Sequence, residues 1–88
     1  MVNAPAALEF PTDYPLKVVG RADEEFSERV HAIVLRHTGE PAAQRVRERA
    51  SANGNFLSIS YLLRAQSRAQ VEGLVAELRA CRGVLMLL

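Results

Sequence analysis

Several residue types that build catalytic and extracellular proteins are scarce in this chain of 88 residues. The single cysteine, Cys81, has no partner for a disulfide within the chain, and tryptophan is absent. The only two histidines, His31 and His37, do not have the i, i+4 spacing of two metal ligands on one helix. A catalytic triad or a metal site needs several such groups brought together. We therefore expect a non-catalytic protein that uses no metal and no cofactor.

Long apolar runs and a strong excess of one charge are also missing. No apolar run approaches the roughly 20 residues of a membrane-spanning helix, and residues 1–13 lack the basic start and apolar stretch of a secretory signal. The formal net charge is +1, whereas nucleic-acid-binding domains usually have a clear basic excess. These absences predict a cytoplasmic protein and argue against a membrane or a nucleic acid as its partner.

The composition is that of one small folded domain. Hydrophobic residues make up 49% and charged residues 24% of the chain, close to the values of globular proteins. Residues 1–13 hold two of the four prolines and show no periodic pattern, which predicts an irregular arm. Residues 14–88 then form a single domain near the lower size limit for an independent core. Self-association or a partner protein is therefore expected.

Asn53-Gly54 marks the clearest turn in the sequence. Both residues tolerate positive φ, which the type I′ turn of a two-residue hairpin requires. Alternating segments flank the pair, from about residue 43 to 51 and from 55 to 64. We therefore predict two antiparallel strands joined by this turn.

The hairpin also fixes which side chains share a face of the sheet. A two-residue turn pairs Arg47 with Ser60, and successive side chains in a strand point to opposite faces. This register predicts that Ile59 and Tyr61 point toward the core. The residues predicted on the opposite, exposed face are Arg45, Arg47, Arg49, Ser58 and Ser60.

Four further segments complete the pattern. Residues 14–20 alternate and end in a glycine, which is typical of a strand. Asp23 is a candidate N-cap for a helix that runs to about Thr38. Ser67 begins a capping-box spacing ahead of a second amphipathic helix, and the short apolar residues 84–88 favour a last strand.

The resulting order is strand, helix, strand, strand, helix, strand. This order predicts an α+β fold of the ferredoxin-like βαββαβ type, with both helices on one face of a four-stranded antiparallel sheet. The expected strand order is 4-1-3-2, which places the second strand at an edge. Charged side chains such as its arginines discourage pairing with a strand of another molecule.

Several strings in the chain together resemble one bacterial protein family. They are LEFPT at residues 8–12, YPLKVVG, RADEEF, GNFLSIS, QVEGLVAEL and a final MLL. With these strings the chain resembles the YbeD-like family of small uncharacterised proteins. The resemblance implies a ferredoxin-like domain similar to ACT regulatory domains, which bind amino acids at oligomer interfaces. Some members are encoded near lipoate-attachment enzymes, which implies a role in metabolic regulation.

The ACT comparison directs attention to Gly20 and Arg21. In ACT domains a glycine after the first strand lets the ligand approach the backbone, and the matching position here is Gly20. A small carboxylate could bind there, although Asp23, Glu24 and Glu25 place acids at the same helix start. A glycine that serves a sharp turn at the strand end is the favoured interpretation of Gly20, and ligand binding is the alternative.

Two hypotheses for function follow. The arginine face, with Lys17 expected beside it and apolar residues of the last strand exposed nearby, could meet an acidic partner. The first hypothesis is therefore a regulatory or adaptor domain whose open sheet face binds an unidentified protein or a second copy. Protection of a sheet edge by charge explains the arginines as well. The alternative function is an ACT-like sensor of an amino acid or carboxylic acid, linked to lipoate metabolism.

Overall fold

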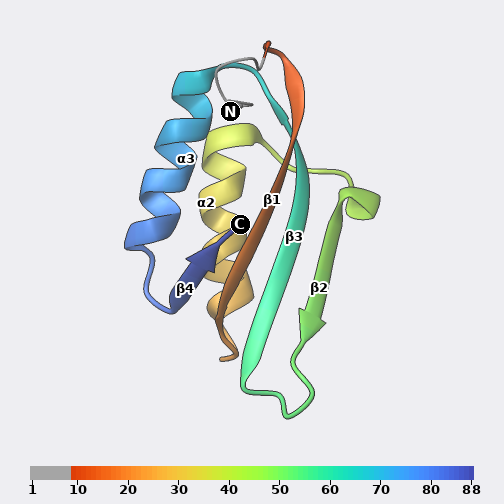
Figure 1. Ribbon diagram of the computed structural model, residues 1–88, viewed down its shortest axis with the longest axis vertical. Coiled ribbons are helices and arrows are strands. Elements are labelled where there is room, and N and C mark those ends of the chain that lie inside the picture. Colours follow the sequence, from red (N-terminus) through yellow and green to blue (C-terminus); the bar gives the residue numbers. More distant parts are fainter. Residues whose placement is uncertain (1–8) are drawn as a thin grey trace, which may run out of the picture.

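The computed structural model describes residues 9–88 as a sheet with two helices packed on one side (Figure 1). The elements are β1 (Thr12–Arg21), α2 (Phe26–Thr38), the 3-10 turn η1 (Ala43–Arg45), β2 (Val46–Ala50), β3 (Phe56–Ala65), α3 (Arg68–Ala80) and β4 (Val84–Leu87). All neighbouring strands are antiparallel in the order β2-β3-β1-β4, which is the predicted order read from the other edge. The predicted ferredoxin-like βαββαβ fold is confirmed.

The first strand and the first helix do not begin where the sequence predicted. β1 begins at Thr12, two residues before the expected start. α2 begins at Phe26, and Asp23 is not its N-cap, because the Asp23 carboxylate instead accepts the Glu25 N–H at 2.8 Å in a turn ahead of the helix. Gly39, with φ of 81°, ends α2 as expected.

The start of α3 is tied to the end of α2. Ser67 caps α3 as predicted, since its Oγ accepts the Gln70 N–H at 3.1 Å. The Gln70 side chain reaches one residue further back than in a standard capping box and accepts the Gln66 N–H at 2.7 Å. Its Nε2 donates to the His37 carbonyl, also at 2.7 Å. One side chain thus links both helices.

The predicted register of the β2–β3 hairpin is confirmed, but the predicted turn type is wrong. Arg47 lies opposite Ser60, as expected. Asn53 does not have positive φ, because glycines are the only described residues that do, so a type I′ turn is excluded. Instead Gly54, with φ of 78°, donates its N–H to the Ser51 carbonyl within a four-residue loop, residues 52–55. This loop has the same centre as the predicted turn, so the faces are unchanged.

The second strand is shorter than predicted. Residues 43–45 form η1, and β2 begins only at Val46. Arg45 therefore precedes the strand. The alternation of strand side chains, which determines the direction of Arg47 and Arg49, does not determine the direction of Arg45. The basic series that the sequence assigned to one strand is divided between a turn and a strand.

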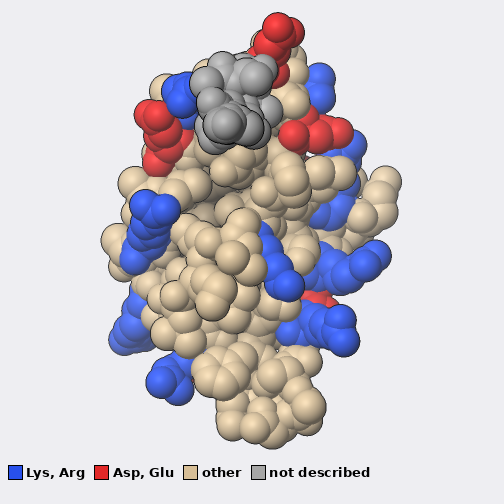
Figure 2. All heavy atoms as spheres, viewed as in Figure 1, with Lys and Arg blue, Asp and Glu red and all other residues tan. Residues whose placement is uncertain are grey.

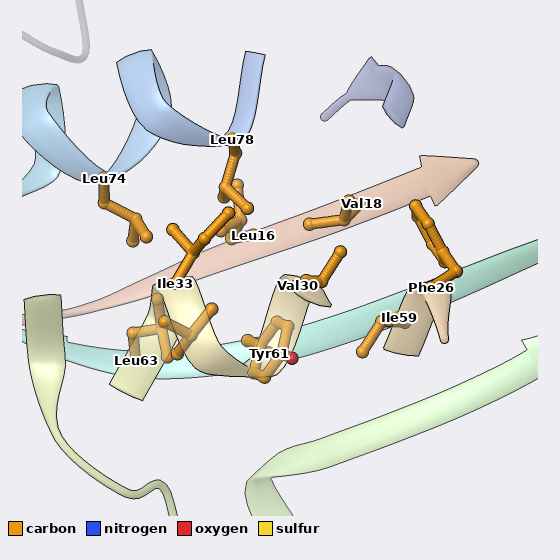
Figure 3. Close-up of a cluster of buried hydrophobic side chains, with 11 residues drawn as sticks. Leu16, Val18, Phe26, Val30, Ile33, Ile59, Tyr61, Leu63, Leu74 and Leu78 are labelled. Carbon is orange, nitrogen blue, oxygen red and sulfur yellow. The ribbon is translucent and has the colours of Figure 1, made fainter. Parts of the chain in front are cut away.

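The hydrophobic core lies between the sheet and the helices. Alternate side chains of β1 and β3 point toward apolar side chains of α2 and α3 (Figure 3). The buried residues of this cluster are Leu16, Val18, Phe26, Val30, Ile33, Val34, Ile59, Tyr61, Leu63, Leu74 and Leu78. The inward direction predicted for Ile59 and Tyr61 is confirmed. Within residues 9–88, no further layer covers the other face of the sheet.

Candidate functional site

Two rows of side chains cross the open face of the sheet from β1 through β3 to β2. The strand pairings fix them, since Lys17 and Arg47 both lie opposite Ser60, while Val19 and Arg49 both lie opposite Ser58. The first row is Lys17, Ser60 and Arg47, and the second is Val19, Ser58 and Arg49. The sequence prediction that these lysine, arginine and serine residues share a face agrees with this register.

Lys17, Arg47 and Arg49 carry the unpaired positive charge of this face. All three are exposed. Within residues 9–88, no acidic side chain forms an ion pair with any of them. Unpaired guanidinium groups remain available for bidentate contacts with carboxylates of another molecule.

Arg45 belongs to a different arrangement. Its Nη1 donates to Asp13 Oδ1 at 3.2 Å and to the Leu62 carbonyl at 3.3 Å. Arg64 also donates to Asp13 Oδ1, at 3.4 Å. The hydrogen bond from Arg45 is the main reason why the pKa of Asp13 lies below its ordinary value. Arg45 therefore fastens η1 to the start of β1 and is not a free cation of the face.

Two shallow hollows lie beside the rows. One is lined by Lys17, Arg49, Phe56 and Ser58 among others, and the second by Arg45, Arg47, Ser60 and Leu62 among others. Each has a volume of about 240 Å³, below the roughly 300 Å³ at which small-molecule sites begin. The face is thus better shaped for a partner surface than for an enclosed ligand.

Exposed apolar side chains accompany the cations. Met86 is 50% exposed and lies opposite Val19, and Leu88 is 66% exposed and exchanges two backbone hydrogen bonds with Lys17. Phe56 and Leu62 of β3 are exposed as well. In Figure 2, lysine and arginine side chains lie along the side of the molecule where β2 lies and also along the opposite side, with a broad uncharged area between them. Apolar area with a charged border is typical of protein-binding surfaces.

The corner at Gly20 is filled by the protein itself. A Cβ atom added to Gly20 would lie 2.3 Å from Phe26 Cζ and 2.4 Å from the Gly83 carbonyl oxygen. The neighbouring Arg21 has an exposed side chain, and its N–H donates to the same carbonyl at 3.1 Å. This close packing explains why position 20 is occupied by a glycine. Ligand binding at Gly20 and Arg21 stays a prediction, which Arg21 variants can test without disturbing this packing.

The sequence analysis did not single out Glu48, which lies between the two arginines of β2. Glu48 is opposite Ile59, so it belongs to the helix side of the sheet. Its Oε2 accepts a hydrogen bond from Ser27 Oγ of α2 at 2.5 Å. The sequence does contain a signal for the position of Glu48, because neighbouring side chains of a strand point to opposite faces and Glu48 stands between Arg47 and Arg49. β2 therefore has basic side chains on the open face of the sheet and an acidic side chain on the helix side.

The described part of the chain offers few other chemical groups. Among residues 9–88, no cluster of three or more histidine, cysteine or acidic side chains could hold a metal ion. In the same residues, no helix has both the length and the apolar character needed to cross a membrane. The cytoplasmic location stays a prediction.

Comparisons with known proteins agree with the resemblance noted from the sequence. A family model described as a protein of unknown function, DUF493, matches residues 5–88. A UPF0250 protein of Ectopseudomonas mendocina is 41% identical over 85 residues, covering 96% of this chain and 92% of the relative. A UPF0250 protein of Hahella chejuensis is also 41% identical, over 92% of this chain and 89% of its own. These matches confirm the YbeD-like resemblance.

A solved structure supports the fold alone. The C-terminal domain of the MgtC protein from Mycobacterium tuberculosis superposes with a TM-score of 0.61 at 22% sequence identity. The match covers 93% of this chain and 89% of that domain. At this level of identity the similarity extends to the arrangement of helices and strands and not to activity.

Proposed function

This chain belongs to the DUF493 family of proteins of unknown function, and we propose that it is a non-catalytic regulatory or adaptor domain whose open sheet face binds an acidic partner protein. The observation that carries the proposal is the group of three exposed cations, Lys17, Arg47 and Arg49, without ion pairs in residues 9–88.

The cations and the apolar residues have separate roles in this proposal. Exposed Met86 and Leu88 supply apolar area whose burial favours association. Arg47 and Arg49 select for carboxylates on the partner, since charge complementarity mainly sets specificity and the rate of encounter. The partner surface should therefore combine an apolar centre with acidic side chains.

A different protein is a better partner for this face than a second copy. In a symmetric dimer the same patch meets itself. A dimer centred on Lys17, Arg47 and Arg49 would bring like charges together, which is unfavourable. Self-association through this face is thus the weaker form of the proposal.

Affinity capture with charge-reversed variants tests the proposal. Bait proteins would be the wild type, Arg47→Glu, and Arg79→Glu as a matched control, because Arg79 is an exposed arginine on α3. We expect quantitative mass spectrometry of bacterial lysates to find proteins with acidic surfaces that the wild type and Arg79→Glu retain and Arg47→Glu loses. Thermal melts would verify that all three baits are equally folded.

Two results would contradict the proposal. Equal capture by all three baits would show that the open face is not the binding surface. The second contradicting result would come from sedimentation velocity. If the wild type formed a dimer that Arg47→Glu dissociates, the molecule bound at the open face would be a second copy of this chain.

A further inference from the structure

A larger recess lies on the other side of β2, where the edge strand and α2 leave a groove of about 680 Å³. This volume is within the range of known binding sites. Its apolar lining comes from α2, from the segment that connects α2 to β2, from β2 and from the core residue Tyr61. The apolar and aromatic residues are Ala32, Leu35, Pro41, Ala43, Val46 and Tyr61. Leu35 is 44% exposed although it is a large apolar side chain.

The charged residues that line the groove are all acidic, which is the opposite of the sheet face. They are Glu28, Glu40 and Glu48, and neither lysine nor arginine lines it. Among residues 9–88, none of the three forms an ion pair with a lysine or arginine. Glu40 lies 3.1 Å from His31 Nε2, and Glu48 accepts only the neutral Ser27 hydroxyl. The groove is therefore a local site of negative charge on a protein whose net charge is +1.

Tyr61 supplies an observation that is independent of the acids. Its side chain is only 3% exposed, stacks on His31 with ring centroids 6.5 Å apart, and lines the groove. Within residues 9–88, its hydroxyl forms no hydrogen bond with the protein, and its oxygen is not among the fully buried polar atoms that lack a partner. Burial, with smaller contributions from Glu48 and Glu40, raises the pKa of Tyr61 to about 12. Because Tyr61 lines the groove and its oxygen is not sealed from solvent, a donor from a bound molecule could form a hydrogen bond with it.

We propose that this groove binds a basic, partly apolar peptide segment of a partner protein. A lysine or arginine side chain of that segment would reach Glu40 and Glu48 and donate a hydrogen bond to the Tyr61 hydroxyl. Apolar side chains beside it would cover Leu35 and Val46. A bare metal ion does not fit, because no described cluster provides three ligands and an ion would leave the apolar lining exposed.

This site is separate from the open face, and the two can be tested independently. Arg47 and Glu48 are neighbours in β2, yet their side chains serve opposite sides of the sheet. Neutral variants of these two residues therefore form a matched pair. Glu72→Gln on α3 is a further control, because it removes an equally negative, exposed side chain that does not line the groove.

An NMR titration of the isotope-labelled protein with a synthetic peptide measures both the site and the affinity. The probe is a peptide of alternating leucine and arginine, compared with hexaarginine and with a peptide of alternating leucine and glutamate. We expect the leucine-arginine peptide to shift resonances around the groove, and the other two peptides to bind more weakly.

The variants give the expected sizes of the effects. Glu40→Gln/Glu48→Gln should weaken binding about three- to tenfold, as expected for two partly exposed ion pairs. Tyr61→Phe should weaken it about two- to tenfold, the range for one lost hydrogen bond. Glu72→Gln and Arg47→Gln should bind no more weakly than the wild type, and melts of each variant would verify folding.

Several outcomes would overturn the proposal. Resonance shifts away from α2 and β2 would place the peptide elsewhere, and equal losses in Glu72→Gln and the groove variant would reduce the effect to net charge. Hexaarginine that binds as tightly as the leucine-arginine peptide would remove the role of the apolar lining. A dimer of the wild type that both Arg47→Gln and Glu48→Gln dissociate would assign the groove to a second copy.

Discussion

Replacing Gly20 with alanine should destabilise the protein by about 2–3 kcal/mol, the sum of a packing cost and a smaller backbone gain. The new Cβ would lie 2.3 Å from Phe26 Cζ and 2.4 Å from the Gly83 carbonyl oxygen, far inside van der Waals contact. Phe26 is 0% exposed, so its ring is enclosed by other parts of the protein. The Gly83 oxygen belongs to the backbone that leads into β4 and accepts the Arg21 N–H, so it is fixed as well.

The magnitude follows from these two contacts. Overpacking of a dense core costs about 1–3 kcal/mol, and a clash that includes backbone belongs at the upper end. Gly20 does not have positive φ, so alanine adopts its backbone conformation without strain. The substitution also lowers the conformational entropy of the unfolded chain, which stabilises the folded state by about 0.4–1 kcal/mol. The net loss is about 2–3 kcal/mol.

Urea unfolding followed by circular dichroism measures this loss. With a slope of about 1–2 kcal/mol/M, the midpoint should fall by about 1–3 M. Gly73→Ala is the matched control, because its Cβ would be 3.4 Å from the nearest atom, in the interior of α3. That change should raise stability by about 0.5–1 kcal/mol. An unchanged midpoint for Gly20→Ala would refute the packing argument and leave the corner open to a ligand.

Three further predictions concern the sheet, a helix start and the buried phenol. In denaturant melts, Ile59→Ala should cost about 2–5 kcal/mol as a core truncation, whereas Ser60→Ala should stay within about 0.5 kcal/mol; the reverse order would refute the assignment of faces. Ser67→Ala should cost about 1 kcal/mol because α3 loses its N-terminal acceptor, and an unchanged melt would contradict the cap. A Tyr14→Phe protein has Tyr61 as its only tyrosine, and absorbance titration should place its pKa at about 12 instead of the ordinary 10.0. Because this folded-state pKa is raised, its contribution to stability is complete below about pH 10 and is lost as the pH rises toward 12; titration near pH 10 would show a solvated hydroxyl.

The sequence predicted the topology and the register because both depend on patterns that lie close together in the chain. Alternation on either side of Asn53-Gly54 determined the centre of the hairpin, and any loop with that centre gives the same faces. The turn type was missed because it depends on local side-chain bonds. Ser51 Oγ accepts the Phe56 N–H at 3.0 Å, and Asn53 Oδ1 lies 3.2 Å from Ser51 Oγ.

The candidate site was predictable only in part. Strand parity placed Arg47 and Arg49 on the open face, but it did not reveal which cations are already paired. Arg45 is neutralised by Asp13, 32 residues away in sequence, after η1 turns it out of the strand. The unpartnered Tyr61 hydroxyl was equally hidden, since an inward direction says nothing about the partners that the interior provides.

The position of β1 in the sheet has a consequence for the order of folding. β1 is a central strand, but none of its partners is near it in the chain, since Thr12 lies opposite Ala65 and Lys17 bonds to Leu88. Among the strands of residues 9–88, the β2–β3 hairpin is the only pairing between strands that are neighbours in sequence. Closing long loops costs entropy before their contacts form, which slows folding. We therefore expect the hairpin to be structured early in the transition state, and β1 to enter the sheet late and to leave it early during unfolding.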